Sequence, residues 1–235
     1  RAGKGQGGGP DTASYALWTL EIAGQKPDEV TTAVTGYLLA RDKGRPHWIR
    51  NSTRPPSMSS DANTNYFVIR ALQTFGSESQ QPEIKARIAD ARQWLLDLKP
   101  ASTEERVFQL RCLQTLSVDD AVQQTSVNEL LKQQNADGGW SQLPEMQSDA
   151  YATGTVLVAL LRSHLIDGDQ PAIGKGIQYL VDTQQNDGSW HVISHAKPFQ
   201  TYFETGFPYG KDQFISVTAS SWATVALLLT QPKVD

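Results

Sequence analysis

The sequence has little of what several common classes of protein depend on. It contains a single cysteine, Cys112, which excludes an intrachain disulfide and a zinc-finger ligand set. Charged residues make up only 20% of the 235 residues, the net charge is −4, and no run of five like charges occurs. Because proteins that bind nucleic acid need a basic surface to neutralise phosphates, a nucleic-acid partner is not expected.

Long apolar segments are also scarce. The longest uncharged stretch, 213–232, carries several hydroxyl side chains, so a buried helix is a better interpretation than a membrane span. Residues 1–9 lack the apolar core of a signal peptide, and the chain starts with Arg1, so we expect a piece of a longer chain. The composition, 39% apolar with 18 glycines, is typical of a globular protein and excludes intrinsic disorder. The sequence does not indicate a compartment.

A repeat is the most informative feature that is present. Residues 133–140 (QQNADGGW) and 184–190 (QQNDGSW) match, with their tryptophans fifty positions apart. Two weaker copies lie upstream, at Tyr37-Leu38 with Trp48 and at Trp94-Leu95. Each copy follows an amphipathic helical pattern that buries one face, and Pro27, Pro82 and Pro171 mark the start of three of these helices.

Five helical segments of another kind lie between the repeats. They are rich in alanine, hydroxyl and large apolar side chains and, except for the third, poor in charge: 11–22, 61–74, 105–116, 149–161 and 214–230. Helices that are apolar nearly all round are buried on more than one side. Nothing in the sequence has the period of a strand. We therefore predict an all-α domain over residues 1–235, with about five inner helices covered by four outer helices.

The repeat carries a family resemblance. Residues 175–184 with Gly188-Ser189-Trp190 resemble the QW repeat of the squalene-hopene cyclase and oxidosqualene cyclase family. Residues 202–210, with Thr-Gly-Phe-Pro at 205–208, resemble the C-terminal segment of that family. The resemblance covers most of the chain from Pro10 onward and implies an α/α toroid, here incomplete. In such a repeat the glutamine would bond the end of a neighbouring helix, the glycine would permit a positive φ, and the tryptophan would cover the junction.

The resemblance also implies a chemistry, and the sequence departs from it at the decisive position. The family protonates an isoprenoid double bond with an Asp-x-Asp-Asp motif that runs into Thr-Ala. Residues 8–13 read Gly-Gly-Pro-Asp-Thr-Ala, so only Asp11 is kept and Pro10 takes the place of the proton donor. We therefore expect a domain that binds an apolar or isoprenoid-like ligand without cyclase chemistry. Two alternatives stay open: a noncatalytic scaffold for a protein or polysaccharide partner, and a cyclase that uses Asp11 as its acid.

Carbocations are stabilised by the faces of aromatic rings, so aromatic residues are the candidate ligand contacts. They lie on the inner helices and in the C-terminal segment: Tyr15, Trp18, Tyr151, Phe207, Tyr209, Phe214 and Trp222. We expect Tyr15, Phe207 and Trp222 to face the axis of the toroid. Phe207 and Trp222 belong to the terminal segment that resembles the family, where Phe207 aligns with a phenylalanine whose ring faces the developing cation, and Tyr15 follows the remnant of the acid motif by about one helical turn. The long connection 191–213 is expected to fold over one mouth of the toroid, either as a structural lid or as a ligand contact.

Neither a metal nor a cofactor is expected. The prenyltransferases that share this fold bind zinc through Asp, Cys and His, but Cys112 has no aspartate two residues before it and no histidine follows on an inner helix. His191 and His195 have helical spacing but follow a turn, which favours a loop. Asp119-Asp120 is expected to cap a helix. The basic connection around Trp48 is expected to be solvated. The partners that remain are an apolar small molecule and, through the rest of the chain, a membrane surface or a protein.

Overall fold

The computed structural model describes residues 7–51, 54–197 and 201–231. This part of the chain is built from α-helices and contains isolated bridges but no strand. More than half of the chain is helical, so the predicted all-α class is confirmed. The helices alternate in character as expected. The inner ones are α1 (Gly9–Ile22), α3 (Asp61–Phe75), α5 (Thr103–Thr115), α7 (Ala150–Leu161) and α9 (Gln213–Leu229); the outer ones are α2 (Glu29–Ala40), α4 (Gln81–Asp97), α6 (Asp120–Lys132) and α8 (Pro171–Thr183).

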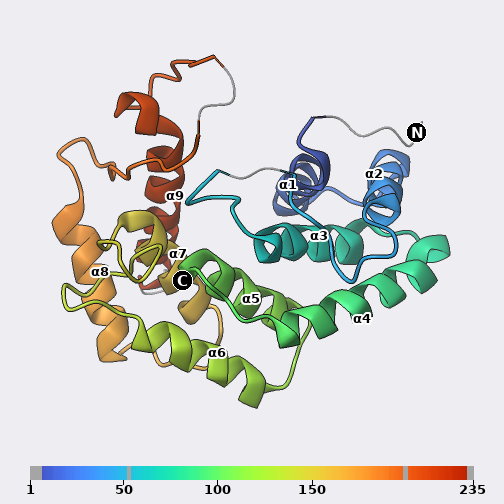
Figure 1. Ribbon diagram of the computed structural model, residues 1–235, viewed down its shortest axis with the longest axis horizontal. Coiled ribbons are helices and arrows are strands. Elements are labelled where there is room, and N and C mark those ends of the chain that lie inside the picture. The colour runs from blue at the N-terminus through green and yellow to red at the C-terminus, as the bar shows by residue number, and fades with distance from the viewer. Residues whose placement is uncertain (1–6, 52–53, 198–200, 232–235) are drawn as a thin grey trace.

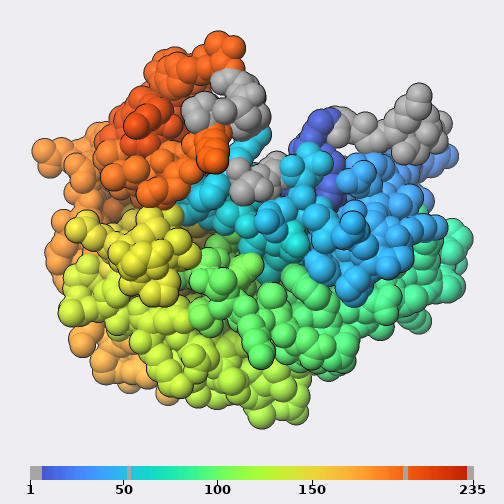
Figure 2. Space-filling model, viewed as in Figure 1, coloured from blue at the N-terminus to red at the C-terminus, as the bar shows by residue number. Residues whose placement is uncertain are grey.

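The inner helices form an arc. Each packs against the next, from α1 through α3, α5 and α7 to α9, and the outer helices cover the convex side (Figure 1). The tightest junction joins α7 to α9, where a Cβ added at Gly154 would lie 2.8 Å from the backbone nitrogen of Ala223. The ring of inner helices is not closed, because α1 and α9 do not meet (Figure 1). The space-filling view has a notch between the C-terminal segment and the N-terminal helices (Figure 2). No helix of the described residues is long and apolar enough to cross a membrane.

The outer helices begin where the sequence places their start signals, with one correction. Pro82 and Pro171 lie in the first turns of α4 and α8. Pro27 lies outside α2, because the Asp28 carboxylate accepts a hydrogen bond from the Thr31 amide at 2.8 Å and starts the helix after it. At α6 the Asp119 side chain accepts from the Ala121 amide, which confirms the capping interpretation.

Three tryptophans make the same contact at the ends of three outer helices. The indole N–H groups of Trp48, Trp140 and Trp190 each donate to a leucine carbonyl ten residues earlier at 2.8 Å. These carbonyls belong to Leu38, Leu130 and Leu180, in the last turns of α2, α6 and α8. Carbonyls there lack some of their intrahelical partners, so the indole N–H satisfies a group that burial would otherwise penalise. Trp48 is fully buried, whereas residues 43–46 just before it are exposed, so the expected solvated connection does not include the tryptophan.

The remaining outer helix, α4, ends differently. Leu95 occupies the equivalent place, and its carbonyl accepts a hydrogen bond from the Gln109 amide of α5 at 2.7 Å. Trp94 instead stacks on His47, with ring centroids 3.9 Å apart. Gln109 thus replaces the missing indole, which explains why this copy is weak in the sequence.

The glycines of the repeat act as expected, but only one of its two glutamines reaches a neighbouring helix. Gly138 and Gly188 have φ values of +87° and +84°, so both turns need glycine. The Gln134 amide donates to the Ala172 carbonyl of α8 at 2.7 Å. Both glutamine amides donate to the glycine carbonyl of their own turn, Gln134 to Gly138 and Gln184 to Gly188, and only Gln134 also reaches the next helix.

Candidate functional site

The inner faces of α3 and α5 carry the same order of side chains. Asn63, Phe67 and Arg70 on α3 and Glu104, Phe108 and Arg111 on α5 each follow i, i+4, i+7, which is one face of a helix. The amide and the carboxyl lie in the first turns, beside the side-chain caps Ser60 and Ser102. The rings lie one turn deeper, and the guanidinium groups one turn beyond the rings. The axis therefore runs from a polar end, through an aromatic zone, to a cationic end.

The aromatic zone encloses a cavity of about 260 Å³ bounded by side chains of all five inner helices. The rings of Tyr15 on α1 and Phe67 on α3 have centroids 4.0 Å apart and planes inclined at 32°, and Trp18 and Phe67 form an edge-type contact at 5.0 Å. Val217, Ser221 and Val225 of α9 form the wall on the side where the ring is open. Six rings line the cavity: Tyr15, Trp18, Phe67, Phe108, Tyr151 and Trp222.

Glu104 lies at the polar end of this cavity. Its carboxylate accepts hydrogen bonds from the Ser59 hydroxyl at 2.6 Å, the Ser59 amide at 2.9 Å, the Tyr151 hydroxyl at 3.2 Å and the Asn63 amide at 3.3 Å. Tyr15 joins this network by donating to the Asn63 side-chain oxygen. Burial raises the pKa of Glu104 to about 7, although the bonds from Ser59 and Tyr151 act in the opposite direction. The carboxyl is therefore a weak acid.

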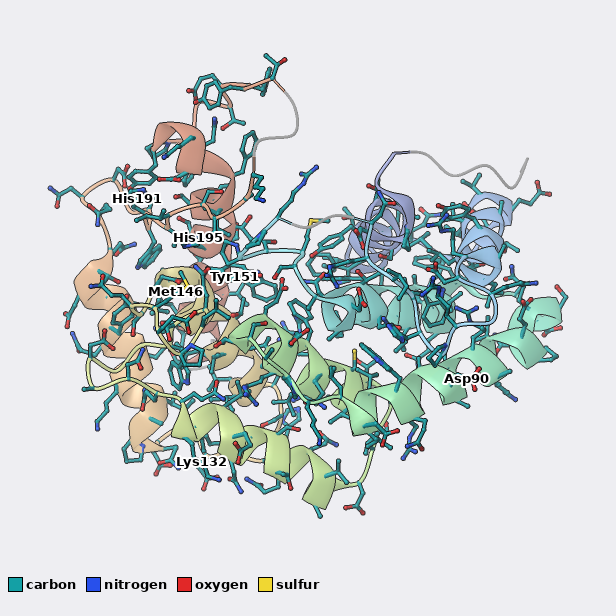
Figure 3. The ribbon with its side chains drawn as sticks, in the orientation of Figure 1. Asp90, Lys132, Met146, Tyr151, His191 and His195 are labelled. Carbon is teal, nitrogen blue, oxygen red and sulfur yellow. The ribbon has the colours of Figure 1, made fainter. Side chains whose placement is uncertain are left out.

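A second cavity, of about 300 Å³, lies on the other side of Tyr151 and Glu104. Its wall includes Met146 and His195, which lie close to Tyr151 in the side-chain view, far from Asp90 and Lys132 on the outer helices (Figure 3). The His195 amide donates to the Pro55 carbonyl at 3.2 Å, so residues 191–197 do reach the polar mouth of the ring. Tyr151 thus lines both cavities, whereas Glu104 lines the second cavity and is connected to the first by its hydrogen bonds from Asn63 and Tyr151.

Arg111 lies at the opposite end. Its side chain is only 5% exposed, and its guanidinium carbon lies 4.2 Å from the Tyr66 ring centroid and 5.0 Å from that of Trp222. It donates to the Tyr66 hydroxyl at 2.8 Å. Burial lowers the pKa of Arg111, since a charge without water around it is costly. The aromatic zone therefore already holds a cation of the protein itself.

Asp11 does not lie among the residues that line either of these cavities. Its carboxylate is buried and accepts from the Thr64 hydroxyl at 2.7 Å and from the Asn51 amide at 2.9 Å. These bonds tie α1 to α3 and to the connection before α3. Pro10, beside it, is buried in the first turn of α1. The geometry thus gives Asp11 a structural role in joining the two helices.

The predicted aromatic contacts divide into two groups. Tyr15, Trp18, Tyr151 and Trp222 lie on the cavity wall. The candidates Tyr209 and Phe214, and Phe207, which we expected to face the axis, are not among the residues that line it. Their positions are as follows: Phe207 packs beside Tyr209, Tyr209 stacks on His191 at 4.5 Å, and Phe214 is 48% exposed.

The physical reason lies in the connection before α9. The Thr205 hydroxyl accepts from the Phe207 amide, and the Glu204 carboxylate accepts from the Gly206 amide, so this segment turns on itself instead of entering the ring. The first residues of α9 that line the cavity are Val217 and Thr218. Phe214 lies one helical turn before them and therefore beyond the end of the cavity.

The remaining candidates have local partners. His191 is in a loop and its Nε2 lies 3.0 Å from Asp212 Oδ2. Cys112 is fully buried on α5, and burial raises the pKa of its thiol, which keeps it unreactive. Within the described ranges, no three His, Cys, Asp or Glu side chains come together as a metal site would require.

Glu104 and Arg111 are the two residues that sequence reasoning missed. The expected helix began at 105, which left Glu104 outside, and the charge of this segment was treated as an exception. The signal was present in the shared i, i+4, i+7 spacing of Asn63, Phe67 and Arg70 with the α5 residues. Two helices that repeat a polar, an aromatic and a basic residue on one face would have marked both ends of the axis.

Comparison with known proteins agrees with this architecture. The family model of the squalene-hopene cyclase C-terminal domain matches residues 101–218, which is half of the chain. The chain belongs to this family. A squalene--hopene cyclase of Bradyrhizobium diazoefficiens is 31% identical over 101 residues, a region that covers 38% of this chain and 14% of that protein. The domain thus matches about a seventh of the length of that relative.

A solved structure supports the fold over nearly the whole chain. It is described as a possible member of the GH105 family from Klebsiella pneumoniae subsp. pneumoniae MGH 78578, with a TM-score of 0.56 and 11% identity. The match covers 97% of this chain and 71% of that one. At this identity the similarity speaks for the fold alone, an α/α toroid.

Proposed function

We propose that this squalene-cyclase-like domain binds a small apolar ligand, or one end of an isoprenoid, and does not cyclise it. The binding site is the cavity lined by the six aromatic rings, which we call the axial cavity. The observation that carries the proposal is the cavity itself, six aromatic rings contributed by all five inner helices. Its volume of about 260 Å³ is just below the ~300–1,000 Å³ usual for ligand pockets, which favours a short apolar group.

The chemistry at the ends of the cavity supports binding without protonation of an alkene. Proline at position 10 has no proton to donate, and both carboxylate oxygens of Asp11 accept hydrogen bonds away from the cavity wall. Glu104 is the acid nearest to the rings, but a pKa of about 7 makes it a poorer proton donor than an ordinary carboxylic acid. Protonation of a carbon–carbon double bond needs a far stronger acid.

The test is uptake of a neutral fluorescent apolar probe. Trp222→Ala is expected to weaken binding about tenfold, because truncating a buried aromatic contact commonly costs about 1–2 kcal/mol. Phe207→Ala removes an aromatic side chain that does not line the cavity and serves as the matched control, with binding unchanged. Circular dichroism of both variants checks that the helices persist.

Two results would overturn the proposal. If the parent protein takes up no probe, the rings are core filling and the scaffold alternative replaces ligand binding. If incubation with squalene gives a cyclised hydrocarbon above a heat-treated control, the domain is an active cyclase, and Asp11→Asn and Glu104→Gln would show which acid serves it.

A further inference from the structure

The positive charge at the cationic end of the axial cavity is only partly neutralised by carboxylates of the described residues. Arg70 on α3 is neutralised, because its guanidinium donates to both carboxylate oxygens of Glu21. Arg111, its counterpart on α5, forms an ion pair with no carboxylate of the described residues, and its Nη1 has no hydrogen-bond partner. Glu104 lies two helical turns away on the same face, a rise of about 10 Å. A buried charge without a counter-charge destabilises the folded protein, and contacts with the faces of aromatic rings compensate only part of this cost.

A second unsatisfied donor lies against the first. The Tyr66 hydroxyl accepts hydrogen bonds from both Arg70 and Arg111, each at 2.8 Å. Its own proton has no acceptor in the described part of the chain, and Tyr66 is only 2% exposed. An Arg111 N–H and the Tyr66 O–H are therefore two neighbouring donors, both buried and both without an acceptor.

Both donors lie beside the wall of the cavity. Arg111 follows Glu104 and Phe108 on the inner face of α5, and its guanidinium carbon lies 5.4 Å from the Phe108 ring centroid and 5.0 Å from that of Trp222. Phe108 and Trp222 line the cavity from α5 and α9. Neither Arg111 nor Tyr66 is itself among the residues that line the cavity, so the guanidinium lies behind the Phe108 and Trp222 rings, at the end of the aromatic zone opposite Glu104.

We propose that the ligand of this cavity is an amphiphile whose short apolar chain fills the aromatic zone and whose oxyanion, a carboxylate or a phosphate, is bound by Arg111 and Tyr66. Such an anion would supply the acceptor that both donors lack and would compensate the buried charge. A ligand that developed positive charge among the same rings would instead be repelled by Arg111. The inference rests on the proposed function, because it names the class of ligand for the same cavity.

The experiment compares three ligands with one apolar chain: geraniol, geranic acid and geranyl phosphate. Each displaces the neutral fluorescent probe from the full chain. The parent is expected to bind at least one of the two anions ten times or more tighter than the alcohol, and the tighter anion identifies the head group. Arg111→Met removes the charge but keeps the length of the side chain, and it is expected to reduce that preference to within twofold while geraniol still binds.

Controls separate a charge effect from a loss of structure. Arg92→Met removes an exposed arginine of the outer helix α4 and should keep the parent's preference. Arg111→Lys keeps the charge and should retain part of it, and Tyr66→Phe removes one donor and should lower it. If Arg111→Met does not fold, these two variants decide the question.

The possible failures are distinguishable. If geraniol and both anions bind the parent equally well, the anion site is wrong and the proposed apolar site stands. If Arg111→Met still prefers an anion, the anion binds elsewhere and the inference is overturned. If none of the three ligands displaces the probe, or no probe binds, the proposed function itself fails.

Discussion

The turns at the ends of the outer helices and the inner face of the ring differ in how much they repeat. Trp48, Trp140 and Trp190 donate to the carbonyls ten residues earlier at one and the same distance of 2.8 Å. On the inner face, α3 and α5 share the order polar, aromatic, basic, but Asn63 corresponds to Glu104, and Arg70 is paired with Glu21 whereas the Arg111 Nη1 has no hydrogen-bond partner. The repeated residues thus maintain the contacts that hold the end of an outer helix. The residues that differ between helices are on the inner faces, where a ligand would be recognised.

The first prediction removes a repeated contact. Trp140→Ala is expected to lower the free energy of unfolding by about 3–5 kcal/mol, since the indole is fully buried and its loss leaves both a cavity and an unpaired Leu130 carbonyl. Urea denaturation measures the change. Gln109→Ala is the matched comparison at the end of α4, where Gln109 takes the place of the indole. We expect it to lower the free energy of unfolding by about 1–2 kcal/mol.

A loss of less than about 1 kcal/mol for Trp140→Ala would contradict the structural role of the repeat. Trp222 is only partly buried and belongs to the cavity wall, so Trp222→Ala should lower the free energy of unfolding less than Trp140→Ala. An equally large decrease would mean that the repeat and the cavity wall do not differ in their structural role.

The second prediction concerns an unrepeated residue, Glu104. Its pKa in the folded protein is about 7, against 4.5 for an ordinary glutamate, so the folded state holds the proton more tightly than the unfolded state. The contribution of Glu104 to stability is therefore fully present below about pH 4.5 and is lost as the pH rises through about 7, by up to about 3 kcal/mol. Glu104→Gln is expected to lack this decrease and to be more stable than the parent at pH 8. Chemical denaturation between pH 4.5 and 8 measures it.

Glu129→Gln is the control for this prediction. Glu129 is exposed, and its hydrogen bond from Lys132 lowers the pKa of its carboxyl, so its removal should not stabilise the protein at pH 8. If Glu104→Gln keeps the parent's decrease, the effect comes from another group. Asp149 is the first to examine, because burial also raises the pKa of its carboxyl.

Much of this fold could be predicted from the sequence, because helical periods and a repeated turn are local signals. The alternation of one-sided and fully apolar helices indicated the two layers, and the repeated tryptophans indicated their common turns. Trp48 was placed in a solvated connection because its neighbours Arg45, His47 and Arg50 are polar. Its burial follows from a carbonyl of α2 that only the folded chain brings into reach.

The site could be predicted only in part, for physical reasons that differ between residues. Tyr15 and Trp222 lie on helices whose faces are fixed by packing, so their place on the wall followed from the pattern. Phe207 lies in a connection whose path depends on its own turn hydrogen bonds, which no period reveals. Glu104 and Arg111 were missed because charged residues in an inner helix contradict the apolar pattern on which the prediction relied.

The central claim is that an apolar ligand occupies the axis of the ring. A crystal structure of the protein soaked with a brominated analogue of geraniol tests it most directly, because the anomalous signal of bromine locates the ligand without reference to activity. We expect one bromine peak among the rings of Tyr15, Phe67 and Trp222, and we expect it to disappear when Thr218→Phe introduces a side chain that fills the cavity. Bromine only on the outer faces of the ring, with the cage empty, would contradict it.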